Sequence, residues 1–465
     1  MKKFDYLLNS FYIIILPLMV AISLDLTPYS KSIESYWKNF NKNTNPYQNQ
    51  LWMENVAVIL RHQPWQLHLW EQLAEMQFEQ NDFLGSINSF KKMENMHPLN
   101  FKHKLVLGKA YWGANQLDEA YTTWQEMIEI PGLEQENFNE LVQLQQSSND
   151  WYGAYLTLLK WQQLFPDSTE MLTPLLLSQV IFDPSSAQET LSSKKNGKLQ
   201  TISADLELIV ENENPVFQMI LAGNVYSKIN QWNYAVAAYA YATRLDPEYA
   251  EGWAFYGNAL TNAGKNGYFA LDKAITLSPK SKIARAYLAS YWRSQNDIEK
   301  SLEIYQSLAD QEPDQPVWQQ ELGNTYISAG KLDEALQAFL NAVEVDPTNA
   351  NNWITLARFC GDYRMEIQAI GLPAARQALS IDDQNWEAND VIGWLFLLLN
   401  DFTSSERFLT LAYEGAPESD IVNLHLGQLF VLQNKKELAA YFLNRSIEFS
   451  ENKEIIQLAR NFLSP

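Results

Sequence analysis

The hydrophobic and polar positions of this chain recur with a period of about 34 residues. The clearest copy of the pattern, from Pro316 to Asn349, reads PVWQQELGNTYISAGKLDEALQAFLNAVEVDPTN. When its first residue is counted as step 1, large apolar residues stand at steps 7, 11 and 24, small residues at steps 8 and 20, and proline at step 32. A fixed repeat of this length is typical of stacked helical units and not of a globular enzyme.

Each step of the pattern has a physical cause. Gly323 and Ala335, at steps 8 and 20, are small enough to let two antiparallel helices cross closely. Leu322, Tyr326 and Phe339, at steps 7, 11 and 24, then fill the space around that crossing. Proline at step 32 ends the second helix because it cannot continue it and pushes the preceding residue out of helical space. The pattern therefore predicts two helices in each copy.

The copies predict how the chain is organised. They begin at Leu67, Phe101, Gln135, Val216, Ala250, Lys282, Pro316, Ala350, Trp386 and Asp420. The copy at Ala250 is two residues short, and the copy at Ala350 carries two extra residues near Gly371. We expect an array of three repeats over residues 67–168, a degenerate repeat or hinge over 169–215, and seven repeats over 216–453. Residues 27–66 read as a linker and a capping helix, and residues 454–465 as a C-terminal capping helix.

This pattern resembles that of the tetratricopeptide repeat family, over about 370 residues, and most clearly in GNTYISAGKLDEALQAFLNAVEVDP. The resemblance implies an all-α fold, a right-handed superhelical solenoid of helix-turn-helix repeats. Members of the family bind other proteins, often as an extended peptide in a concave groove that the first helices line. The long array also resembles the repeat region of O-GlcNAc transferases.

The N-terminal segment is the second informative feature. Lys2 and Lys3 precede an apolar run from Phe11 to Leu24, whose uninterrupted part is shorter than the roughly 20 residues that span a bilayer. The run extends back to Leu7 if Asn9 and Ser10 are tolerated. Three interpretations of residues 1–26 stay open: a non-cleaved membrane anchor, a cleaved signal peptide, and an apolar N-terminus of a soluble protein. The first two place everything after Leu26 outside the cytoplasm. We therefore expect a membrane protein with a single N-terminal span and an exported repeat region, or a secreted protein after signal cleavage.

The charge and composition of the chain restrict the classes of partner that we expect it to bind. Acidic residues number 55 and basic residues 34, a net charge of −21, which argues against nucleic acid as the main partner. We expect basic or neutral proteins or peptides instead, and the membrane through the N-terminal segment. Cys360 is the single cysteine and stands at step 11, a core position, so no disulfide within the chain is possible.

Signals of catalysis are weak. The five histidines form no metal-ligand spacing, and the chain has no nucleophile elbow, phosphate loop or dinucleotide fingerprint. We therefore predict no enzyme, and no catalytic residue, cofactor or metal site.

Candidate binding residues lie at the steps that point away from the second helix, which are steps 2, 5, 9 and 12 or 13. Step 9 carries Asn224, Asn258, Ser290 and Asn324 in four successive copies. An Asn side chain both donates and accepts hydrogen bonds, so such a row can pair with the main chain of any peptide, as asparagine ladders do in O-GlcNAc transferases. The alternative is that Asn is simply a common polar residue on a solvated helix face. Tyr241 and Phe255 are the aromatic contact candidates.

These observations favour a membrane-tethered scaffold that binds partner proteins or extended peptides in its groove. Two alternatives stay open: a substrate-adaptor module for a separate glycosyltransferase or other enzyme, and a purely structural stalk.

Overall fold

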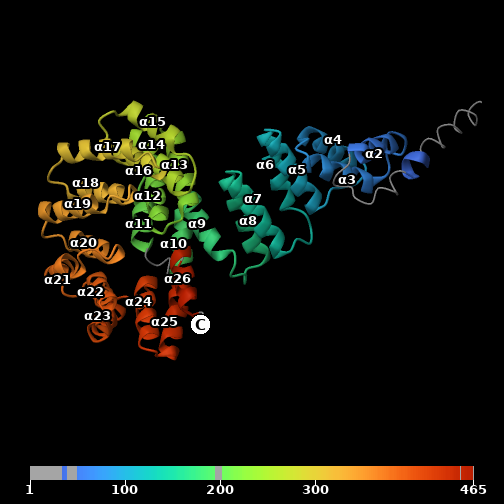
Figure 1. The fold of residues 1–465 in the computed structure, drawn as a ribbon. Coiled ribbons are helices and arrows are strands. Elements are labelled where there is room, and N and C mark those ends of the chain that lie inside the picture. Colours follow the sequence, from blue (N-terminus) through green and yellow to red (C-terminus); the bar gives the residue numbers. More distant parts are fainter. Residues whose placement is uncertain (1–33, 39–49, 194–201, 451, 464–465) are drawn as a thin grey trace, which may run out of the picture. The chain divides into compact units, whose positions relative to one another are not determined.

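The computed structural model describes residues 34–38, 50–193, 202–450 and 452–463 (Figure 1). Throughout these ranges the regular structure is helical, and no strand occurs in them. The chain divides into two compact units, Met1–Val225 and Tyr226–Pro465.

The first unit contains the helices that precede residue 226. They are α2 (Gln50–His62), α3 (Leu67–Glu79), α4 (Phe83–Glu94), α5 (Phe101–Gly113), α6 (Leu117–Met127), α7 (Gln135–Ser147), α8 (Trp151–Leu164), α9 (Leu172–Phe182), α10 (Pro184–Ser193) and α11 (Ser203–Glu211). Helix α12 (Pro215–Lys228) runs across the boundary between the units. Helices α9 to α11 fall within the stretch that the sequence leaves irregular.

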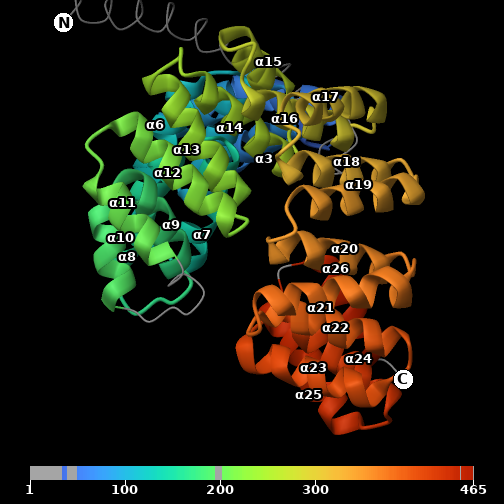
Figure 2. The ribbon, with the colours of Figure 1, turned by 90° about the vertical axis from the view of Figure 1, so that its left-hand side faces the viewer.

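The second unit continues the alternation of first and second helices. Its elements are α13 (Trp232–Leu245), α14 (Ala250–Asn262), α15 (Tyr268–Leu277), α16 (Lys282–Ser294), α17 (Ile298–Gln311), α18 (Pro316–Ser328), α19 (Leu332–Val345), α20 (Ala350–Asp362), the π-helix η3 (Ile367–Gly371), α21 (Leu372–Ile381), α22 (Trp386–Leu398), α23 (Phe402–Gly415), α24 (Asp420–Leu432), α25 (Lys436–Phe449) and α26 (Lys453–Leu463). Figure 2 shows successive pairs such as α16 with α17 and α18 with α19 side by side.

The first helices begin where the copies of the sequence pattern begin. Helices α3, α5, α7, α14, α16, α18, α20, α22 and α24 start at step 1, and α12 starts one residue earlier, at Pro215. The all-helical repeat architecture is thereby confirmed. The limits of the two arrays and of the stretch between them stay predictions.

Close helix crossing explains the small residue at step 8. A Cβ atom on Gly323 would lie 2.7 Å from the Phe339 ring, and one on Gly393 would lie 2.7 Å from Cγ of Leu409. Both partners stand at step 24 of the same copy, and neither distance leaves room for a methyl group. Ala335, at step 20, is fully buried in the same crossing.

A regular feature that the pattern analysis missed lies at step 15, in the turn between the two helices. Every copy has a left-handed residue there: Asn81, Asn115, Asn149, Asn230, Gly264, Asn296, Gly330, Arg364, Asn400 and Asn434. Gly and Asn adopt this conformation at the lowest cost, which accounts for nine of these turns. Arg364, with φ 53°, is the exception.

The two irregular copies depart from the others in their second helices. In the short copy, α15 has 10 residues, whereas α19 has 14. Gly267 takes over the close crossing, since a Cβ atom there would lie 2.2 Å from the Gly257 carbonyl oxygen. In the long copy, η3 absorbs the extra residues in a single π-helical turn, which follows Glu366 in a left-handed conformation.

Cys360 lies in the core of the second unit, as its step predicts. Its side chain is fully buried beside Leu356 and Leu372. Burial raises the pKa of the thiol to about 11, and the Glu366 carboxylate adds to the shift.

The predicted localisation needs correction. No helix among the described residues is long and apolar enough to cross a membrane. The longest of them have 14 residues, or about 21 Å, against a hydrocarbon core of about 30 Å. This finding contradicts the predicted membrane localisation, and the membrane is dropped as a partner. The predicted N-terminal hydrophobic helix and its signal-peptide alternative fall on residues 1–26, outside the described residues.

Candidate functional site

The candidate site is a set of amide and hydroxyl side chains at steps 9 and 13 of three neighbouring first helices in the second unit. We call it the polar row, and it consists of Asn258 and Asn262 on α14, Ser290 and Ser294 on α16, and Asn324 and Ser328 on α18. Asn258 and Ser290 are half-buried, and the other four residues are exposed. Because steps 9 and 13 are one helical turn apart, each helix contributes two neighbouring polar side chains.

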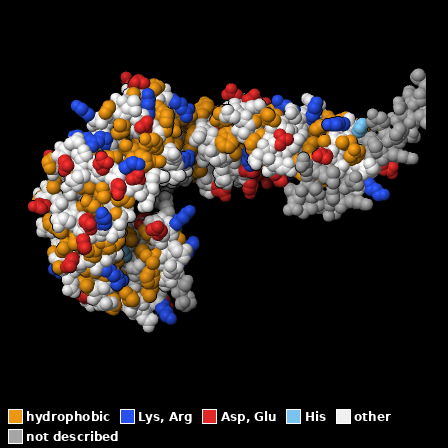
Figure 3. Space-filling view, turned by 45° about the horizontal axis from the view of Figure 1, so that its top comes forward, with side chains coloured by type: hydrophobic (Ala, Val, Ile, Leu, Met, Phe, Trp, Pro, Cys, Tyr) orange, Lys and Arg blue, Asp and Glu red, His pale blue; other side chains and the backbone are white. Residues whose placement is uncertain are grey.

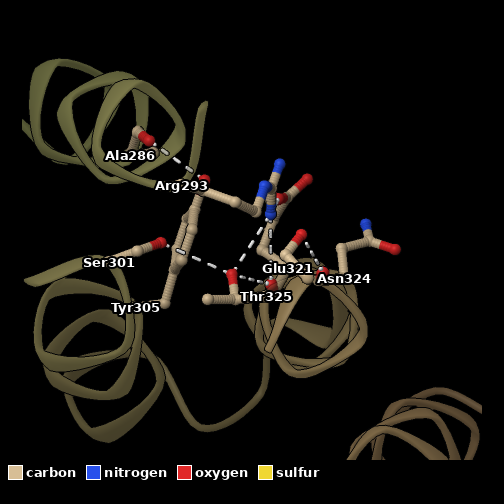
Figure 4. A network of polar contacts seen from close by, with 8 residues as sticks. Ala286, Arg293, Ser301, Tyr305, Glu321, Asn324 and Thr325 are labelled. Carbon is tan, nitrogen blue, oxygen red and sulfur yellow. Dashed lines mark hydrogen bonds and ion pairs between the residues drawn. The ribbon is translucent and has the colours of Figure 1, made fainter. Parts of the chain in front are cut away.

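Three of the four predicted ladder residues lie in the polar row, and their side chains differ in what they contact. The Asn258 amide oxygen accepts a hydrogen bond from Nδ2 of Asn262 at 3.1 Å. Ser290 lies beside Tyr305 and partly offsets the rise that burial causes in the pKa of the tyrosine hydroxyl. Asn324 is exposed, and Figure 4 shows its amide pointing away from the polar network beside it. The fourth residue, Asn224, is exposed on α12 in the first unit.

A network of polar contacts holds helices α16, α17 and α18 together beside Asn324 (Figure 4). Nη1 of Arg293 donates to the Glu321 carboxylate at 2.7 Å and to Oγ1 of Thr325 at 3.2 Å. The Thr325 hydroxyl donates in turn to the Glu321 carbonyl oxygen at 2.7 Å. Ser301 on α17 reaches the same hydroxyl at 3.4 Å. These contacts fix the backbone that carries the exposed Asn324 side chain.

Tyr305 joins the network from α17. Its Oη donates to the Ala286 carbonyl oxygen on α16 at 3.1 Å. Burial raises the pKa of the Tyr305 hydroxyl, Glu321 adds to that effect, and Arg293 and Ser290 oppose it. The hydroxyl therefore stays protonated and keeps its role as a donor.

Polar contacts also link each first helix to the next along the C-terminal part of the second unit. The links are Arg293 with Glu321 at 2.7 Å, Gln320 with Asn352 at 2.8 Å, Arg358 with Glu387 at 3.5 Å, and Asp390 with His425 at 2.9 Å. They join α16 to α18, α18 to α20, α20 to α22, and α22 to α24. Charged side chains on these helices thus serve the stacking of repeats, which limits how many remain for a ligand.

The last of these links lies in a tightly packed aromatic setting. The His425 ring stacks on Trp394, with centroids 5.2 Å apart and an interplanar angle of 6°. Gly361 lies so close to Trp394 that a Cβ atom would be 2.3 Å from the indole. Neighbouring Asp362 is exposed, yet the surrounding protein atoms raise the pKa of its carboxyl, against the effect of Arg358 and His425.

The structure places the two aromatic candidates mainly in packing contacts. Phe255 stacks on Tyr239, with centroids 5.5 Å apart, and meets Tyr287 of the next first helix at 6.1 Å. The Arg244 guanidinium lies 4.7 Å from the centroid of the half-buried Tyr241 ring. Phe269, on the short helix α15, is 73% exposed. The two-residue deletion in its copy was the sequence signal for this exposed ring.

Within the described ranges, no group of three or more His, Cys, Asp and Glu side chains could hold a metal ion.

Comparison with known proteins agrees with this architecture. Residues 319–349 match the family model of the tetratricopeptide repeat, within the clearest copy of the pattern. The chain is a helical repeat scaffold, a class of protein consistent with protein binding. The match to the family model supports the tetratricopeptide type for that scaffold. A comparison with curated proteins gave no match.

Several solved structures are similar in outline. Yeast Tom70 has a TM-score of 0.45 and 12% identity, with 94% of this chain and 96% of that chain covered. The Cut9–Hcn1 hetero-tetramer of APC/C has a TM-score of 0.40 and 13% identity, with 95% and 94% covered. YrrB, whose structure is described as a TPR protein with an unusual peptide-binding site, has a TM-score of 0.30 and 18% identity, with 41% and 98% covered. The likeness to O-GlcNAc transferases stays a prediction.

Proposed function

We propose that this chain is a scaffold that binds an extended segment of a partner protein along the polar row of its second unit. The observation that supports this best is the exposure of Asn262, Ser294, Asn324 and Ser328 at steps that the helix crossing does not use. Amide and hydroxyl groups pair with the main chain of a peptide whatever its sequence, because they both donate and accept hydrogen bonds. The row therefore suits recognition of an extended backbone.

The polar network beside the row supports the same function. Arg293, Glu321 and Thr325 hold α16 and α18 in a defined arrangement in the absence of a partner. A surface that is ordered before binding loses less conformational entropy on binding. Asn324 is then presented to a partner without rearrangement of its helix.

The charge of the chain favours a basic or neutral partner. The net charge of −21 speeds the encounter with basic segments and slows that with acidic ones. On the face drawn in Figure 3, acidic and basic side chains are dispersed in small groups among apolar and uncharged ones. Charge therefore steers the encounter, and hydrogen bonding at the row holds the complex.

An array of 15-residue peptides, probed with the full chain, tests this proposal. We expect a subset of peptides to bind, and Asn258→Ala/Asn324→Ala to weaken them about 30-fold, since each lost hydrogen bond costs about 1 kcal/mol. The matched control is Asn233→Ala, an exposed asparagine on the second helix α13, which should leave binding unchanged. Equal losses in both variants would refute the role of the row. If no peptide binds at all, the structural-stalk alternative gains support instead.

A further inference from the structure

A cavity of about 450 Å³ lies in the first unit between helices α4, α5 and α6. Two buried side chains, Leu107 and Tyr111, are the apolar part of its lining. Four carboxylates also line it, those of Glu94, Asp118, Glu119 and Glu126. The volume falls in the range of about 300–1,000 Å³ that is usual for ligand pockets.

One residue that lines the cavity, Lys104, stands at a step where three other copies have a tryptophan. In three other copies step 4 is a tryptophan, and its indole Nε1 donates to the carbonyl oxygen of a proline six residues earlier. These pairs are Trp70 with Pro64 at 2.8 Å, Trp253 with Pro247 at 2.8 Å, and Trp353 with Pro347 at 2.9 Å. In the copy that begins at Phe101, step 4 is Lys104, whose ammonium pairs with Glu126 on the second helix of its own copy. Lys104 is one of the residues that line the cavity.

The charges around the cavity are unbalanced. Lys104 is the single basic residue among those that line it, and it faces four carboxylates. In the described part of the chain, Glu94, Asp118 and Glu119 take part in no ion pair. The Tyr111 ring already attracts one cation, since the Lys91 ammonium lies 5.4 Å from its centroid. A cavity whose lining combines apolar side chains with an excess of negative charge fits a side chain with an alkyl stem and a cationic head.

We propose that this cavity binds an arginine side chain of a partner protein. Arginine fits better than lysine, because its planar guanidinium offers five donors to several carboxylates at once. The alkyl stem lies against Leu107. The site belongs to the first unit and is independent of the polar row, so that either one can fail without the other.

Fluorescence polarisation with the full chain and a fluorescein-labelled peptide, Ser-Gly-Arg-Gly-Arg-Gly-Ser, tests the proposal. Asp118→Asn/Glu119→Gln should weaken binding by roughly fivefold or more, because two of the carboxylates lose their charge. The matched control is Glu136→Gln/Glu140→Gln, which removes two exposed acidic charges from α7, one of them also in a first helical turn. It should change binding by less than about twofold. Equal weakening by both variants would show a general attraction to an acidic protein and overturn the proposal.

Two further measurements control for damage to the fold and test whether binding requires the positive charge of arginine. Lys104→Met removes the competing ammonium and should tighten binding by roughly threefold, an effect opposite in sign to that of damage to the fold. The same peptide with citrulline in place of arginine, which keeps the shape and lacks the charge, should not bind. Binding of the citrulline peptide, or unchanged binding by Lys104→Met, would refute the cation site. Asn258→Ala/Asn324→Ala should leave the arginine peptide bound, which separates this site from the polar row.

Discussion

Gly323→Ala tests the close crossing of α18 and α19. The new methyl group would lie 2.7, 2.8 and 3.0 Å from three atoms of the Phe339 ring. The ring is 2% exposed, and its contact with Phe359, at a centroid distance of 5.1 Å, leaves it little room to move. Overpacking of this kind costs about 1–3 kcal/mol, whereas the change from Gly to Ala in a helix gains about 1 kcal/mol. Three contacts with a confined ring place the cost near the upper end, so we expect a net loss of about 2 kcal/mol.

Hydrogen exchange of the amides of α18 and α19 is the suitable assay, together with the urea midpoint. Long repeat arrays do not unfold in one cooperative step, so a local measurement is more informative than a single free energy of unfolding. Ser328→Ala, an exposed change on the same helix, should alter protection by less than about 0.5 kcal/mol.

A second substitution isolates the steric cause. In the copy at Ala350, step 8 is already an alanine, Ala357, and both it and the small Ala375 on α21 are fully buried in the same core cluster. In a Phe339→Ala background the methyl group of Gly323→Ala should therefore cost nothing, although Phe339→Ala alone costs about 3–5 kcal/mol. Protection in Gly323→Ala equal to that of the wild type would refute the reasoning. So would strictly additive losses in the double variant.

Two further predictions concern the irregular copy. Arg364→Asn should stabilise the second unit by about 0.5–1 kcal/mol in urea unfolding, because Asn suits the left-handed turn at φ 53°, and Asn400→Arg should lose a similar amount. The pKa of the Cys360 thiol is raised from 9.0 to about 11, so the folded state favours the protonated form, and its contribution to stability is complete below pH 9 and lost as pH rises to 11. The urea midpoint should fall over that range more steeply in the wild type than in Cys360→Ala. An equal slope would show that the thiol does not titrate as the structure implies.

The regular repeats of the fold could be predicted from the spacing of residues, whereas helices α9 to α11 and η3 could not. Helix starts, the close crossing at step 8 and the buried Cys360 all follow from positions within one copy, because each copy repeats the same local geometry. The left-handed turn at step 15 could also have been predicted, because nine copies have Asn or Gly there and these residues adopt that conformation at low cost. The fold of residues 1–26 remains outside what the structure describes.

The candidate site was less predictable, because its contacts join different copies. Ser290 matches the ladder position in the sequence, yet it is half-buried beside Tyr305 of the next helix. Phe255 looks like an available aromatic ring, yet Tyr239 and Tyr287 pack on it from helices on either side. A pattern within one copy cannot report which side chains meet across an interface between helices. Of the three predicted ladder residues that lie in the polar row, Asn324 alone has an exposed side chain.

Departures from the repeat are therefore better guides to binding than its regular positions. A side chain at a core step of the pattern already packs against the neighbouring helix. A ligand therefore cannot make new contacts with it. Lys104 stands at a step where three other copies have a tryptophan, and it lines a cavity whose carboxylates outnumber its basic groups. The short helix α15 breaks it as well and leaves Phe269 exposed. Each departure removes a contact that stacked repeats would otherwise make. The side chains left exposed there can make favourable contacts with a partner protein instead.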